Sequence, residues 1–225
     1  MSLSHENTIL NRKQNYDYTK RIFDLAIAIS LLIILLPVFA VVGFMVRISL
    51  GTPVFFCQLR PGKNGKPFVI YKFRTMTDER GKDGNLISDA DRIKSVGYFL
   101  RMMSLDELPA LWNVIKGEMS LVGPRPMLMQ YLDYYTLEQA RRHEVNPGVT
   151  GWASIHGRNN TLFSKRFAMD VWYVDNRSFL LDMRILLATF FKVLKHEGAI
   201  VGQDVKEIDD INLFENSLNK KRRGK

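Results

Sequence analysis

Two adjacent carboxylates, Asp106 and Glu107, are the residues of this chain best placed to do chemistry. Ser104 lies three residues before Glu107, a spacing typical of a capping box at the start of a helix. In a first helical turn, free backbone amides and the positive end of the dipole stabilise ionised carboxylates and favour bound phosphate. An ionised aspartate held there can act as a nucleophile toward phosphorus. The alternative is structural, because acidic residues are common in first turns.

Several cations lie where they could hold phosphate oxygens. Lys72 and Arg74 are two residues apart in a predicted strand, so they point to the same face. Arg125 lies between Pro124 and Pro126, which restrict the backbone and present a guanidinium at low entropic cost. A solvated strand face and an ordinary rigid turn would produce the same two patterns.

Composition limits the classes of protein that fit. The chain has 225 residues, which is enough for one domain with a sizeable core. Its formal net charge of +9 indicates an anionic partner, either nucleic acid, an acidic membrane surface or a phosphorylated substrate. The single cysteine, Cys57, excludes an intramolecular disulfide and a thiolate metal cluster. The four histidines are scattered, so we expect no zinc site.

Residues 25–46 carry no charged side chain, and so long an apolar run indicates a membrane segment. A signal peptide is not expected, because the run exceeds a signal core and no small-residue cleavage pattern follows. Pro37 should break the helix into arms of roughly 18 and 15 Å, each about half of a hydrocarbon core. A re-entrant hairpin and a kinked spanning helix both fit. Flanking basic residues favour cytoplasmic ends.

The rest of the chain predicts a mainly α fold with a small β-hairpin, of the α+β class. Two aromatic and β-branched runs around a Gly/Asn/Pro turn indicate the hairpin, at 53–58 and 67–74. Helical spacing of apolar residues occurs at 93–103, 105–116, 127–144, 164–174 and 178–197. The last segment is strongly apolar with cations at its edge, which suits either an amphipathic helix at a membrane interface or a buried core helix.

Five motifs follow one another in a fixed order: the proline-broken apolar segment, YKFRTM at 71–76, SLDELPAL at 104–111, KGEMSLVGPRP at 116–126 and NPGVTGW at 146–152. Together they resemble the bacterial sugar transferase family, the small monotopic phosphoglycosyl transferases that start glycan assembly on a membrane lipid carrier. The similarity runs from about residue 17 to residue 198. One departure is Leu36, since family members often have serine before the helix-breaking proline.

The resemblance implies magnesium-dependent transfer of a sugar-1-phosphate from a UDP-sugar to polyprenyl (undecaprenyl) phosphate, in two steps through an enzyme-bound intermediate. Asp106 matches the nucleophile that attacks the sugar-bearing phosphate and releases UMP. Glu107 matches its partner in metal binding and proton handling. UDP-N-acetyl sugars are the donor class that the analogy favours.

Other positions of the family's site are matched by both cations and carboxylates of this chain. The basic positions that hold phosphate oxygens are matched by Lys72, Arg101 and Arg125. Two acidic positions are matched by Asp170 and Asp182, which we expect in substrate binding. A carboxylate approaching a pyrophosphate meets like charge, so fixed cations and Mg²⁺ are needed to offset the repulsion.

The resemblance also implies an organisation and a location. We expect a flexible N-terminus at 1–16, a re-entrant helix-break-helix at 17–50, a catalytic domain at 51–200 and a polar basic tail at 201–225. The catalytic domain should lie on the cytoplasmic face of the bacterial inner membrane, in contact with lipid. The tail could touch anionic lipid or be disordered.

Two other classes of function compete with the transferase. One is a membrane-anchored basic scaffold protein that binds anionic lipid. The other is a nucleic-acid-binding protein, which is not expected because the cations form no recognised module and the apolar segment would be unexplained.

Overall fold

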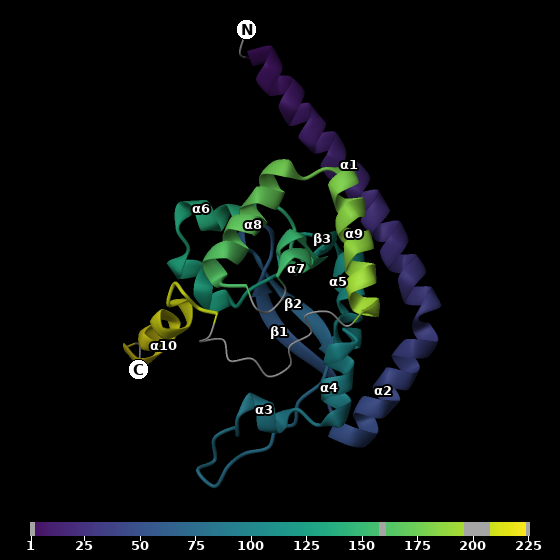
Figure 1. Ribbon diagram of the computed structural model, residues 1–225, viewed down its shortest axis with the longest axis vertical. Helices are drawn as coiled ribbons and strands as arrows, with labels where there is room; N and C mark the ends of the chain where they lie inside the picture. The colour runs from purple at the N-terminus through teal and green to yellow at the C-terminus, as the bar shows by residue number, and fades with distance from the viewer. Residues whose placement is uncertain (1–2, 158–160, 196–207, 224–225) are drawn as a thin grey trace.

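The structure is a computed structural model, and it describes residues 3–157, 161–195 and 208–223, with side chains described from residue 16 to residue 218 of these ranges. Two long N-terminal helices, α1 (Leu3–Ile34) and α2 (Leu36–Leu50), run along one side of the molecule and meet at a bend (Figure 1). α1 continues without interruption through the predicted boundary at residue 17.

The helix break predicted at Pro37 is confirmed, and the bend between the two helices is 63°. Pro37 lies in the first turn of α2, where a missing amide costs least. Within the described residues, no single helix is both long and apolar enough to cross a membrane, whereas this bent pair meets that test by length and composition.

The predicted hairpin is confirmed as β1 (Phe55–Pro61) paired antiparallel with β2 (Pro67–Phe73). The one-turn helix η1 (Lys63–Gly65) joins the two strands, with Asn64 in the left-handed region at φ 56°. A second, parallel pair links β3 (Ser120–Val122) to β4 (Gly148–Thr150). The sequence patterns did not predict this pair, because strands of three residues carry too little periodicity to be recognised.

The helices of the domain follow the predicted order but not always the predicted bounds. α8 (Phe163–Asn176) and α9 (Phe179–Leu194) confirm the helices expected at 164–174 and 178–197, although residues 196 and 197 lie outside the described ranges. The helix expected at 93–103 is confirmed as α4 (Ser95–Met102), and a separate one-turn helix, α3 (Asp89–Arg92), precedes it. The shorter helices α5 (Ala110–Lys116) and α7 (Trp152–His156) precede α8.

The continuous helix predicted at 127–144 is wrong. The segment forms three short pieces, η3 (Met129–Tyr134), α6 (Leu137–Ala140) and η4 (Arg141–Glu144). The chain is extended at Tyr135 and Thr136, and the Thr136 side chain forms a capping box with Gln139 that starts a new helix.

In the predicted tail, Leu213–Arg223 form α10, which packs near η3. The basic side chains at the end of this tail lie outside the described part of the chain.

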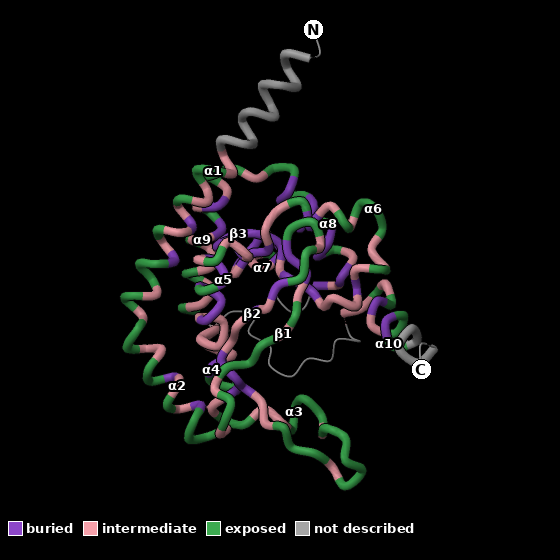
Figure 2. Tube along the Cα trace, turned by 180° about the vertical axis from the view of Figure 1, so that it is seen from behind, coloured by how far each residue is buried: buried purple, intermediate pink, exposed green. Residues whose placement is uncertain are grey.

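Buried residues fill the centre of the domain, whereas the outer side of α1 and α2 is exposed (Figure 2). The main core cluster joins α1, β2, α5, β3 and α9, and a smaller one joins α2 to β2 and α4. The third cluster packs η3 and α8 against α10. The hairpin, α5 and the β3–β4 pair are thereby held against the N-terminal helices.

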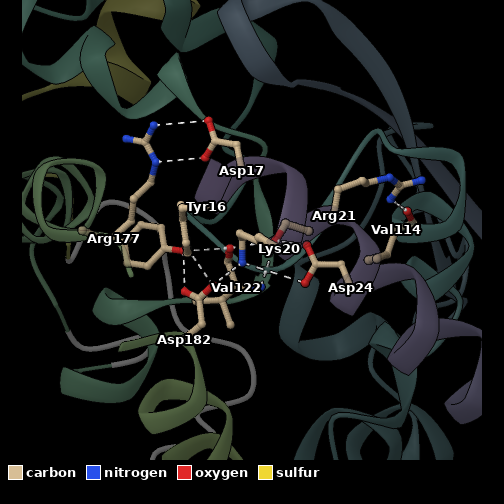
Figure 3. A network of polar contacts seen from close by, with 11 residues as sticks. Tyr16, Asp17, Lys20, Arg21, Asp24, Val114, Val122, Arg177 and Asp182 are labelled. Carbon is tan, nitrogen blue, oxygen red and sulfur yellow. Dashed lines mark hydrogen bonds and ion pairs between the residues drawn. The ribbon is translucent and has the colours of Figure 1, made fainter. Parts of the chain in front are cut away.

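A buried polar network attaches α1 to the rest of the domain (Figure 3). The carboxylate of Asp182, which is 2% exposed, accepts hydrogen bonds from Tyr16 at 2.8 Å, Lys20 at 2.5 Å and Tyr173 at 2.7 Å. Arg21 donates to the last carbonyls of α5 at 2.5 and 2.8 Å, and so acts as a cap for that helix. Asp182 therefore fixes α1 against the rest of the domain.

We expect Lys20→Gln to destabilise the fold, because it leaves the buried Asp182 carboxylate without its cation. Breaking such a pair costs about 3 kcal/mol, which would lower the Tm of a chain of this size by roughly 6–12 °C. Thermal unfolding in detergent would measure this shift. Lys66→Gln, at an exposed turn position, is the matched control. Equal unfolding temperatures for both variants would show that the network does not hold α1.

Candidate active site

The segment that carries the paired carboxylates differs from its predicted form. The capping box at Ser104 does not form, because Ser104 adopts a left-handed conformation (φ 55°) and its side chain makes no capping hydrogen bond. An N-cap residue needs an extended backbone instead. Asp106 and Glu107 lie in a single 3₁₀ turn, η2 (Leu105–Glu107), and α5 begins only at Ala110, after Pro109. The helix dipole therefore does not explain their ionisation.

Glu107 is held between two cations from distant parts of the chain. Lys72 of β2 donates to Glu107 Oε1 at 2.6 Å, and Arg125 donates to the same oxygen at 2.7 Å. Burial alone would raise the pKa of Glu107, but Arg125 and Lys72 outweigh it, and the pKa lies well below its usual range. Glu107 is therefore ionised and fixed in orientation.

Asp106 has a different environment. Burial, followed by repulsion from Glu107, raises the pKa of Asp106 to about 6, although Lys72, Arg101 and Arg125 oppose the rise. Within the described residues, its carboxylate forms no hydrogen bond and no ion pair. In many active sites, two neighbouring carboxylates have different pKa values because their environments differ, and each then has a distinct chemical role. Asp106 is thus the carboxylate that is available to react.

A small pocket of about 40 Å³ opens beside this pair. Three cations line it, Arg60, Lys72 and Arg125, together with the Glu107 carboxylate. Apolar side chains supply most of the remaining wall: Ile70, Ala110, Met119 and Val149. Asp106 is adjacent in the chain but is not a lining residue. The surplus of positive charge makes the pocket suitable for an anionic group.

Arg60 belongs to this site but was missed in the sequence. Its guanidinium donates to Gln58 Oε1 at 2.6 Å and to the Pro126 carbonyl at 3.1 Å. Burial and the neighbouring Arg125 lower the pKa of Arg60 to about 10, which leaves it charged at neutral pH. The available signal was the Gln58-Leu59-Arg60 alternation, which places the amide and the guanidinium on one strand face.

The structure places the other predicted cations differently. Arg101 donates to Thr75 Oγ1 at 2.9 Å, and it lies near enough to Asp106 for their charges to interact. Arg74 instead binds backbone carbonyls around residues 50–52 and at Met76, and pairs with Asp78 at 2.5 Å. Lys72 and Arg74 therefore do not act as a pair on one phosphate, and Arg74 has a structural role.

The two remaining acidic candidates do not line the pocket. Asp170 forms a buried ion pair with Arg142 at 2.6 Å, and Asp182 belongs to the network that holds α1. The structure brings Lys72, Glu107 and Arg125 into direct contact, with Asp106 and Arg101 beside them, and it assigns Asp170 and Asp182 other contacts.

The carboxylates fit Mg²⁺ in number and chemistry. Magnesium prefers oxygen ligands, keeps several waters and often takes only one or two protein carboxylates. Asp106 offers an unengaged carboxylate and Glu107 a neighbouring one, whereas the described residues contain no group of three or more metal-ligating side chains. A cation held chiefly by protein ligands would not suit this pair.

A paired carboxylate beside a basic pocket, on a domain attached to an apolar bent helix pair, suits an enzyme that handles an anionic substrate. Residues 15–196 match the model of the family described as bacterial sugar transferase. The chain belongs to that family and is a transferase.

Curated relatives fall into two size classes. The chain is 57% identical over 179 residues to an uncharacterized sugar transferase, EpsL, of Bacillus subtilis, covering 80% of this chain and 89% of the relative. It is 38% identical over 198 residues to the exopolysaccharide production protein ExoY of Sinorhizobium fredii, covering 80% of this chain and 88% of that protein. It is 38% identical over 190 residues to the UDP-glucose:undecaprenyl-phosphate glucose-1-phosphate transferase of Escherichia coli, covering 80% of this chain and 41% of that longer protein.

Proposed function

We propose that this protein transfers a sugar-1-phosphate from a UDP-sugar to polyprenyl (undecaprenyl) phosphate, as the first membrane step of glycan or glycoconjugate assembly. The names of several relatives specify this reaction, among them the Klebsiella pneumoniae protein at 39% identity over 190 residues, of which this chain covers 41%. The observation that carries the proposal is the Glu107 carboxylate fixed by Lys72 and Arg125 on the pocket wall, with Asp106 free beside it.

The reaction proceeds in two displacements at one phosphorus atom. An Asp106 carboxylate oxygen attacks the phosphorus that bears the sugar, and the bond to the bridging oxygen breaks, so that UMP leaves. An oxygen of the polyprenyl phosphate then attacks the same phosphorus, which releases Asp106 and forms the lipid diphosphate sugar. Lys72, Arg101 and Arg125 offset the repulsion between the carboxylate and the donor diphosphate.

Asp106 and Glu107 would hold the Mg²⁺ that the family implies, with the remaining positions left to water and substrate oxygens. When bound, the ion would neutralise charge on the donor phosphates. Glu107 is suited to the supporting role because its orientation is fixed on both sides.

The pKa of Asp106 predicts the pH dependence of the first displacement. Only the ionised carboxylate is a nucleophile, so the second-order rate constant for UMP release should be constant above about pH 7 and fall by up to tenfold per pH unit at acidic pH. The fall should begin near pH 6 at low Mg²⁺ and at a lower pH when Mg²⁺ is saturating, because a cation bound beside Asp106 favours its ionised form. The assay should omit the lipid acceptor, whose own phosphate titrates nearby, and follow a single turnover of UMP release. A rate that stays constant from pH 8 to pH 4 at low and at saturating Mg²⁺ would contradict the assignment.

The exposed apolar surface supports a membrane-bound protein. Around the bend, Ile33, Ile34 and Leu36 are 62–69% exposed. α9 lies beside α1 in both views, and Phe23 of α1 packs against Phe179 of α9 (Figures 1 and 2). Leu187, Phe190, Phe191 and Leu194 of α9 are also exposed. We propose that α1 and α2 re-enter the cytoplasmic membrane, with α9 at its interface.

Cysteine labelling tests this topology. Because Cys57 is exposed, the variants need a Cys57→Ser background. Arg12→Cys should react with a membrane-impermeant reagent only from the cytoplasmic side, as should the control Asn85→Cys in the exposed 81–85 loop of the domain. Labelling of residue 12 from outside intact cells, with residue 85 protected, would establish a spanning segment instead.

The reaction itself is tested with purified protein, Mg²⁺, polyprenyl phosphate and a panel of UDP-sugars. We expect UMP release with one class of donor, and UDP-N-acetyl sugars come first in the panel, beside UDP-glucose and UDP-galactose. The scaffold alternative predicts binding to anionic vesicles without UMP release from any donor. That second outcome would reject the proposed function.

A further inference from the structure

The turn that presents Arg125 is held from three sides. The carbonyls of Pro124, Arg125 and Pro126 each accept a hydrogen bond from a different segment: from the Gly148 amide at 2.9 Å, from Arg142 at 2.7 Å and from Arg60 at 3.1 Å. The two prolines also restrict φ. The three hydrogen bonds therefore restrain the turn in addition to the restriction that its two prolines impose.

One of these donors, Arg142, is buried and makes several polar contacts. Its side chain is 1% exposed, and the Asp170 carboxylate that it contacts at 2.6 and 3.1 Å is 2% exposed. Nη1 donates to the Tyr135 hydroxyl at 3.2 Å, and the guanidinium lies 4.7 Å from the centre of the Phe167 ring. Each of the three guanidinium nitrogens thus donates to at least one partner, and one of these partners is the Arg125 carbonyl.

The stability of the fold does not explain well why a buried ion pair is present here. Removing two charges from water costs several kcal/mol, and well-packed apolar residues often stabilise a fold as well as a buried ion pair does. A guanidinium does supply something that apolar residues lack, a planar set of donors that fixes several acceptors in one geometry. Here one of those acceptors is the backbone of Arg125.

We propose that Arg142, held in place by Asp170, is a positioning residue that fixes the Arg125 backbone so that the Arg125 side chain meets Glu107. This inference rests on the proposed transferase function and extends it to a pair outside the pocket. Asp170 accordingly acts through Arg142 and Arg125, and not on the substrate as the sequence predicted. The side chain of Arg125 is 42% exposed, and among the described residues it donates hydrogen bonds only to Glu107, so its backbone largely decides where it lies.

A double-mutant cycle tests the proposal. Removing Arg142 alone would leave the buried Asp170 carboxylate without its cation and could prevent folding. The test variant therefore replaces both members of the pair, Arg142→Met with Asp170→Leu. We expect kcat/KM for UMP release to fall at least tenfold, and Arg125→Met to produce a loss of its own. If Arg142 acts through Arg125, adding the pair replacement to Arg125→Met should lower kcat/KM by less than twofold further.

Arg141→Gln is the matched control, because Arg141 is the chain neighbour whose side chain pairs with surface carboxylates, and its activity should stay within twofold of the wild type. An equal fold-loss from the pair replacement in both backgrounds would overturn the proposal. If the wild-type protein released no UMP, the proposed function would fail, and a structure of the pair variant would decide the inference separately. Retention of the Arg125–Glu107 contact in that structure would overturn it, and its loss would support it.

Discussion

Asp106→Asn should abolish UMP release, with a loss on the order of 10⁴-fold or more, because an amide cannot form the covalent bond to phosphorus. Asp83→Asn, in an exposed loop, should keep full activity and serves as the control. The measurement is single-turnover UMP release at pH 7.5 with saturating donor. Substantial turnover by a folded Asp106→Asn protein would remove the nucleophile assignment.

The same substitution should stabilise the fold. The carboxyl of Asp106 has a pKa of about 6 in the folded protein and about 3.9 in an unfolded chain, so the fold disfavours its ionised form. This cost is absent below about pH 4, where both states are protonated, grows as pH rises to about 6 and is complete above it. Asparagine removes the cost, so in EDTA at pH 7 we expect a gain on the order of 2 kcal/mol that disappears near pH 4.

Glu107→Gln should lower UMP release by roughly 10²–10³-fold, the range seen when one preorganised electrostatic contact is lost from a site. The neutral side chain would leave Lys72 and Arg125 without the carboxylate that orients both. It would also remove the negative neighbour of Asp106, so the fall in rate at acidic pH should begin at a lower pH than in the wild type.

A pH–rate profile of Glu107→Gln beside the wild type measures both effects. Glu144→Gln, at an exposed ion pair with Arg141, is the control and should match the wild type. If the rate of Glu107→Gln began to fall at the same acidic pH as that of the wild type, the two carboxylates would not interact as the structure indicates.

Local sequence patterns predicted the parts of the fold that local physics controls. Pro37 breaks the helix because it lacks an amide, and the hairpin forms because its turn joins two runs with strand propensity. The predicted helix at 127–144 failed because Thr136 starts a new helix with its own capping box. Apolar spacing alone did not reveal this interruption. At Ser104 the same capping pattern was present but the backbone turned left-handed, so the motif had no effect.

The site was predicted in its chemistry but not in its contacts. Asp106, Glu107, Lys72 and Arg125 could be named from motifs, yet Lys72 and Glu107 are 35 positions apart, and nothing local shows that they meet. The same holds for Asp182, whose partner Lys20 is 162 positions away. An acidic residue that matches a family pattern can thus bind a structural partner within the protein. Sequence similarity alone does not show whether such a residue contacts the protein or the substrate.

Incubating the wild-type protein with a competent UDP-sugar and Mg²⁺, without lipid acceptor, tests the central claim most directly. Intact-mass and peptide analysis should then find one phosphosugar per chain, on the peptide that contains Asp106, formed together with one equivalent of UMP and discharged when polyprenyl phosphate is added. Turnover with acceptor present, but with no adduct and no stoichiometric UMP in its absence, would contradict the account.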